Sequence, residues 1–81
     1  MNKKIVDLKN MLISICMFEE AQNIEKILTI SKDEILKELY RFRDLRNHAK
    51  ELEAVSTGDD FLKYRYHRET LEKIMETIMI L

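Results

Sequence analysis

Arginine, histidine and tyrosine are concentrated in two short stretches of this 81-residue chain. Residues 39–48 and 64–68 together hold all the arginines, both histidines and all three tyrosines. Guanidinium groups bind phosphates and carboxylates in a two-pronged manner, and aromatic rings between them stack on bases. The chemistry that these residue types favour is recognition of an anion, a nucleic acid or an acidic protein surface.

Two long helices must position these stretches. Ser31 and Glu34 have the spacing of a capping box, so one helix is expected from about Lys32 to Ala54. A second helix is expected from about Asp59 to Leu81, because apolar residues recur there at helical spacing. Its stripe consists of Tyr64, His67, Leu71, Ile74, Ile78 and Leu81.

The chain has few places to turn, because it contains one glycine and no proline. The short link of residues 55–58 therefore favours an antiparallel hairpin of the two helices. In this hairpin Arg46 lies level with His67, and His48 lies level with Arg65. The two basic, aromatic stretches then merge into one outward patch.

The patch is our candidate partner-binding surface. Helical spacing places Arg43, Arg46 and Lys50 on one face, and nearby glutamates and Asp44 offer ion pairs that would neutralise part of this charge. A protein partner with an acidic surface is expected first, and a nucleic acid is the alternative. The residues assigned to this surface are Tyr40, Arg43, Arg46, Lys50, Arg65 and Tyr66.

The first segment, residues 2–28, carries two apolar stripes displaced around the helix. We expect either two helices with a bend near Phe18 and Glu19, or one helix enclosed by its neighbours. Cys16 lies in an apolar run and is expected to be a buried, inert thiol. The sequence thus predicts one all-α domain over residues 1–81: a small bundle of three or four helices with a long C-terminal antiparallel hairpin.

More apolar side chains are present than three helices can cover. Exposed apolar patches mark partner surfaces, and symmetric pairing is the commonest solution. We therefore expect a homo-oligomer, most simply a dimer. The residues assigned to the oligomer contact are Ile13, Met17, Phe18, Leu62, Ile80 and Leu81.

One pattern is typical of an enzyme family. Residues 43–48 read R-x-x-x-x-H, which resembles the signature of the HEPN ribonucleases, helical proteins that dimerise to assemble a catalytic arginine and histidine. The resemblance covers six residues and implies roles for Arg43 and His48. On one continuous helix, however, residues five apart point about 140° apart. We predict no enzyme, and keep the HEPN-like ribonuclease as an alternative.

Composition limits the remaining classes. The net charge is −1, so no overall field attracts the protein to nucleic acid or membrane. One cysteine and two histidines make a zinc site implausible, and no cofactor, metal or small-molecule substrate is expected. The longest apolar run, residues 11–18, is far below the ~20 residues of a membrane span. A small cytoplasmic regulator or adaptor is the expected function.

Overall fold

The computed structural model describes residues 3–28 and 32–80, and these ranges contain only α-helices and the links between them. This confirms the predicted small all-α bundle, with four helices. The expected capping box depends on Ser31, which lies outside the described residues. The helices are α1 (Lys3–Ser14), α2 (Phe18–Leu28), α3 (Lys32–Val55) and α4 (Gly58–Met79).

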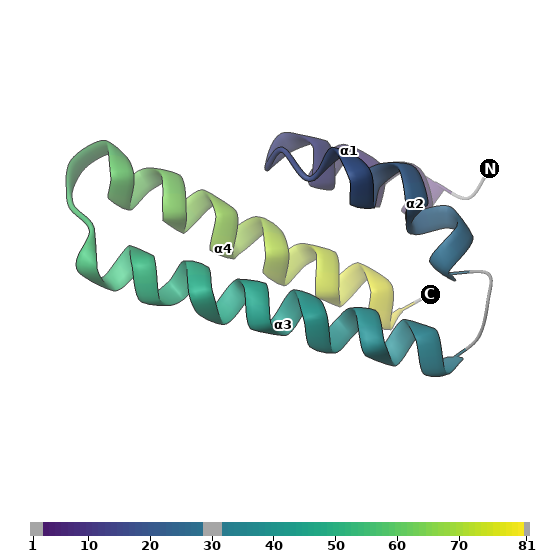
Figure 1. The fold of residues 1–81 in the computed structure, drawn as a ribbon. Coiled ribbons are helices and arrows are strands. Elements are labelled where there is room, and N and C mark those ends of the chain that lie inside the picture. The colour runs from purple at the N-terminus through teal and green to yellow at the C-terminus, as the bar shows by residue number, and fades with distance from the viewer. Residues whose placement is uncertain (1–2, 29–31, 81) are drawn as a thin grey trace.

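The long helices α3 and α4 form an antiparallel hairpin, and the short pair α1 and α2 lies along one side of it (Figure 1). The hairpin turns at the only glycine, Gly58, whose φ of +63° is in the region that glycine adopts without strain. The short pair covers the part of the hairpin near its open end. The closed end, which we call the hairpin tip, extends beyond it (Figure 1).

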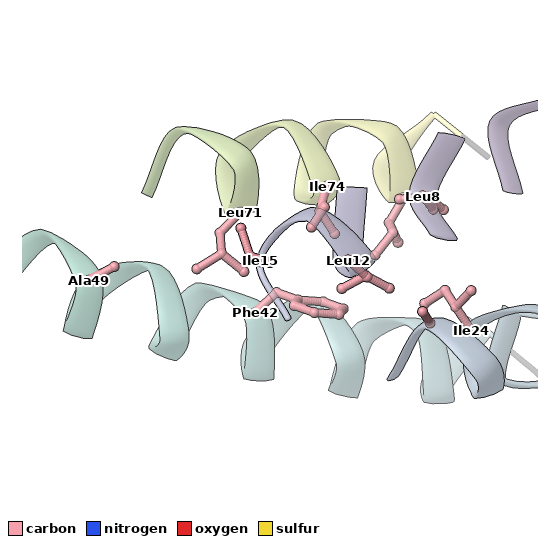
Figure 2. Close-up of a cluster of buried hydrophobic side chains, with 10 residues drawn as sticks. Leu8, Leu12, Ile15, Ile24, Phe42, Ala49, Leu71 and Ile74 are labelled. Carbon is pink, nitrogen blue, oxygen red and sulfur yellow. The ribbon is translucent and has the colours of Figure 1, made fainter. Parts of the chain in front are cut away.

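Phe42 lies at the centre of the core and is completely buried. Figure 2 shows its ring on α3 facing side chains of α1 and α4. The predicted stripes of α1 and α4 supply most of the remaining core. Ala49 lies at the end of the core that is nearer the hairpin tip (Figure 2). The buried apolar residues are Leu8, Leu12, Ile15, Ala21, Ile24, Phe42, Ala49, Leu71, Ile74 and Ile78.

The break between α1 and α2 is centred on Cys16, not on residues 18–19 as the sequence predicted. Backbone N–H groups of Cys16 and Met17 donate to the carbonyls of Ile13 and Leu12, at 3.0 and 2.9 Å. This is a Schellman motif, and Cys16 occupies its left-handed position with φ +64°. Because the turn leads the thiol outward, Cys16 is exposed and the prediction of a buried thiol is wrong.

Candidate functional site

A groove of about 430 Å³ runs between α3 and α4. Its α3 edge carries Arg43 and Arg46, and Glu72 and Glu76 lie on its α4 edge. Apolar side chains separate the two charged edges. The groove is thus an apolar strip with a basic edge and an acidic edge. Its lining residues are Leu39, Tyr40, Arg43, Arg46, Glu72, Met75, Glu76 and Met79.

The groove opens on the side of the hairpin away from α1 and α2. Arg41 points toward the short pair, since its Nη1 lies 3.1 Å from Glu20 Oε1 on α2. Arg43 follows two residues later and therefore points about 160° away from Arg41. No residue of α1 or α2 lines the groove, so among the described residues this surface belongs to α3 and α4 alone.

Arg43 is the most accessible charge at the basic edge. Its guanidinium lies 5.1 Å from the ring centroid of Tyr40, three residues earlier on the helix. Such stacking holds the cation without removing its charge. The nearest carboxylate is the exposed Asp44, at 3.5 Å from Nη2. Because about half of the Arg43 side chain is exposed, it remains available to an anionic partner.

Arg46 is more strongly engaged than Arg43. Its Nη1 lies 3.7 Å from Glu72 Oε1 across the groove, and its Nε donates to Asn47 Oδ1 at 2.9 Å. Arg68 of α4 also contacts Glu72 Oε1, at 3.1 Å. Guanidinium groups from both basic stretches therefore meet at one carboxylate, which confirms that the hairpin brings these two stretches together.

Every arginine of the chain has a carboxylate nearby in this structure. The shortest nitrogen–oxygen distances range from 2.5 Å for Arg41 to 3.7 Å for Arg46. The pair between Arg68 and Glu53 links α4 to α3. Intramolecular ion pairing thus absorbs much of the basic charge, and only Arg43 and Arg65 keep about half of their side-chain surface exposed.

The predicted partner-binding set is divided between surfaces. Tyr40, Arg43 and Arg46 line the groove together. Lys50 is exposed one helical turn beyond Arg46. Arg65 pairs with Glu69 on its own helix, at 3.1 Å, and is not among the residues that line the groove.

Tyr66 is also exposed outside the groove, because it lies about 100° further around α4 than Arg65. Three apolar groove residues, Leu39, Met75 and Met79, are not among the predicted binding residues. The only sequence pattern that points to them is an apolar stripe wider than contact with one neighbouring helix requires.

The predicted oligomer residues are also separated. Ile13 and Phe18 share a hollow of about 270 Å³ on the outer side of α1 and α2. Met17 lines a different hollow on the hairpin. Leu62 and Ile80 are exposed on one side of α4, roughly 27 Å apart along the helix. Leu81 lies outside the described residues, so these side chains do not form one continuous patch.

Arg43 and His48 of the R-x-x-x-x-H pattern do not converge within the chain. Arg43 lines the groove, while His48 lines a hollow of about 260 Å³ together with His67. Burial lowers the pKa of His67, and the nearby Lys63 lowers it further. Within residues 3–28 and 32–80, no cluster of three or more histidine, cysteine, aspartate or glutamate side chains is arranged to hold a metal ion.

Comparison with protein-family models, with curated proteins and with solved structures finds no match. None of the helices in the described ranges is long and apolar enough to cross a bilayer. The groove and its charges are therefore the basis for a functional proposal.

Proposed function

We propose that this protein is a small, non-enzymatic regulator or adaptor that docks a helical segment of an acidic protein partner and also self-associates. The exposed guanidinium of Arg43, stacked on Tyr40 at the edge of an apolar groove, is the observation that supports docking most strongly. Arginine and tyrosine are enriched among residues that dominate binding energy at interfaces. An amphipathic helix is a suitable partner, because helix-in-groove recognition uses apolar anchors on one helix face.

The charges of the groove favour one orientation of the partner helix. Acidic side chains would face Arg43 and Arg46, whereas Glu72 and Glu76 would repel them from the α4 edge. The lined part of α4 spans residues 72–79, which is on the order of 10 Å of helix. About two turns of a partner fit this length, so two apolar anchors would reach Leu39, Met75 and Met79.

Affinity capture from cells that naturally express the protein tests this function. The groove variant is Arg43→Glu combined with Arg46→Glu. The control variant, Lys3→Glu with Lys73→Glu, makes the same change in net charge at exposed positions outside the groove. We expect the groove variant to capture at least ten-fold less partner than the wild type while it keeps its helicity. The control variant should capture as much partner as the wild type. Equal capture by both variants would contradict the proposal.

Nucleic acid is an outcome that the same experiment detects. If capture disappears after nuclease treatment, and a gel shift at low salt weakens steeply as salt rises, the partner is a nucleic acid. The acidic edge formed by Glu72 and Glu76 favours a protein partner over a phosphate backbone. Cleavage of an RNA pool by the intact protein, lost in His48→Ala, would contradict the non-enzymatic assignment.

A further inference from the structure

The two edges of the groove carry opposite charges, and each edge keeps one charge that the hairpin does not satisfy across the groove. On α4, Glu76 is exposed, and within the described ranges its carboxylate takes part in no ion pair or side-chain hydrogen bond. On α3, the exposed Asp44 of the same helix is the only described carboxylate within ion-pair distance of Arg43. Arg43 and Glu76 are therefore both available to a neighbouring molecule.

These two charges lie at nearly the same height along the hairpin. The distance of 3.7 Å between Arg46 Nη1 and Glu72 Oε1 fixes the register of the two antiparallel helices. From this contact Arg43 lies three residues back along α3, and Glu76 lies four residues further along α4. These are steps of about 4.5 and 6 Å toward the same end of the hairpin. Arg43 and Glu76 thus occupy opposite edges of the groove at matching heights.

An exposed apolar strip lies between the charged edges. Met79 is 66% exposed and Tyr40 is 56% exposed. Leu36, which precedes Tyr40 by about one helical turn, is 50% exposed and continues the strip along α3. Leu39 and Met75 complete it within the groove. A molecule that covers this surface fully must offer an apolar strip of its own and both signs of charge, with the negative edge facing α3 and the positive edge facing α4.

We infer that a second copy of this chain covers the groove in a two-fold symmetric homodimer, and that docking of an acidic partner competes with this dimer. A two-fold axis parallel to the groove lays α3 of each copy on α4 of the other and preserves the height of every residue. Arg43 of each copy then meets Glu76 of the other copy, and the apolar strips face each other. An axis across the groove would instead bring Arg43 against Arg43, which like-charge repulsion disfavours.

The two-fold axis along the groove also gives a compact arrangement of helices. Each long helix becomes antiparallel to both of its neighbours, as in up-and-down four-helix bundles. Because the groove opens on the side of the hairpin away from α1 and α2, the short pairs of both copies lie on the outside of the dimer (Figure 1). The second copy satisfies both charged edges, whereas an acidic helix satisfies only the α3 edge.

The competition rests on the docking proposed above, but the dimer itself does not. Ion pairs at an accessible surface contribute little to binding. We therefore expect a weak dimer that forms as the concentration approaches millimolar and dissociates at low micromolar concentration, where the groove is open to its partner. Self-association and docking then exclude each other, because both use the same surface.

Sedimentation equilibrium of charge-reversal variants tests the interface. For the wild type, the average mass should approach twice 9.8 kDa as the concentration rises to millimolar. Arg43→Glu and Glu76→Lys should each remain helical monomers under these conditions, because each change puts like charges opposite each other in both pairs between the copies. An equimolar mixture of the two variants should associate at least about ten-fold more tightly than either variant alone, because both pairs are then of opposite charge.

Arg65→Glu and Glu69→Lys are the matched controls. They make the same changes of charge on α4 outside the groove, at side chains that are about half exposed. Both variants should dimerise as the wild type does. A wild type that is monomeric at millimolar concentration, a dimer that persists in Arg43→Glu, or a mixture that does not associate would overturn the inference.

The mass of the captured complex tests the competition. A complex with the partner should contain one copy of this chain, and a complex with two copies would contradict shared use of the groove. Failure of the dimer and failure of the docking are distinguishable. A wild-type monomer whose capture is lost in the Arg43→Glu, Arg46→Glu variant would contradict the dimer alone. A wild-type dimer together with undiminished capture by that variant would contradict the docking and with it the competition.

Discussion

Arg68 of α4 and Glu53 of α3 form a two-pronged ion pair across the helical hairpin. Arg68 Nε lies 2.7 Å from Glu53 Oε1, and Nη2 lies 3.3 Å from Oε2. Both side chains are mostly buried, with 23% and 14% of their surface exposed. The pair joins the two long helices close to the tip, where α1 and α2 no longer cover them, so it helps to keep the tip closed.

Glu53→Gln is predicted to destabilise the protein, because Arg68 loses its closest partner in a partly buried position. The hydrogen bond from Arg68 lowers the pKa of Glu53 below its ordinary value of about 4.5. A carboxyl group with a lowered pKa stabilises the fold at neutral pH, and this stabilisation disappears as pH falls below about 4.5. Urea unfolding at pH 7 and at pH 3 should show that the free energy of unfolding decreases less for Glu53→Gln than for the wild type.

Glu69→Gln is the matched control for this prediction. Glu69 pairs with Arg65 on the same helix at 3.1 Å and lies at 4.0 Å from Arg68, and the side chains of Glu69 and Arg65 are about half exposed. Exposed pairs of this kind contribute little, so a change of less than about 0.5 kcal/mol is expected. Equal destabilisation by Glu53→Gln and Glu69→Gln would refute a special role for the Arg68 pair.

The pH dependence expected from His67 has the same direction as that of Glu53, but it falls in a higher pH range and has a separate cause. Burial lowers its pKa below the ordinary value of 6.5, and Lys63 adds repulsion. Because the folded state disfavours the protonated ring, stability is complete above pH 6.5 and falls as pH decreases through the lowered pKa. His48 lines the same hollow, together with Tyr64 and Met17. His67→Gln should remove the loss of thermal stability between pH 7 and pH 5; an unchanged loss would show that other groups cause it.

Cys16→Gly is predicted to stabilise the protein by about 0.5–1 kcal/mol. Residue 16 adopts φ +64°, which costs a residue with a Cβ energy that glycine does not pay. Cys16→Ala keeps the Cβ and should leave stability nearly unchanged. Urea unfolding of the three proteins measures the difference. A glycine variant no more stable than the alanine variant would argue against the left-handed turn.

Phe42→Ala should cost about 3–5 kcal/mol, since a fully buried ring leaves a cavity among three helices. That is a large share of the ~4–12 kcal/mol expected for 81 residues, so partial unfolding at 25 °C is expected. Tyr66→Ala removes a ring that is half exposed and should change stability by less than about 0.5 kcal/mol. Circular dichroism during urea titration distinguishes the two variants.

Helix type and extent were predictable from the sequence, because the long helices depend on local spacing and on the scarcity of turn residues. The predicted limits, Lys32–Ala54 and Asp59–Leu81, differ from those of α3 and α4 by at most two residues. The turn at Cys16 was not predictable, since no glycine marks its left-handed position. Apolar neighbours suggested burial there, but the turn geometry exposes the thiol.

The candidate site was predictable only in part. Arg43 and Arg46 were placed correctly on one face, because three-residue spacing fixes their relative direction. Arg65 was assigned to the same patch from its level along the hairpin, but its direction around α4 and its pair with Glu69 separate it from the groove. The position at which two residues lie level along the hairpin depends on the length of the link. The direction in which a residue points around its helix depends on how the two helices are rotated. Core packing around Phe42 determines that rotation.

The proposal that α3 and α4 form the docking face is tested most directly by amide hydrogen exchange of the protein with and without its captured partner. The account predicts that exchange slows upon binding at residues 36–47 of α3 and 72–79 of α4, while α1 and α2 are unchanged. Protection confined to α1 and α2 would contradict a partner bound in the groove.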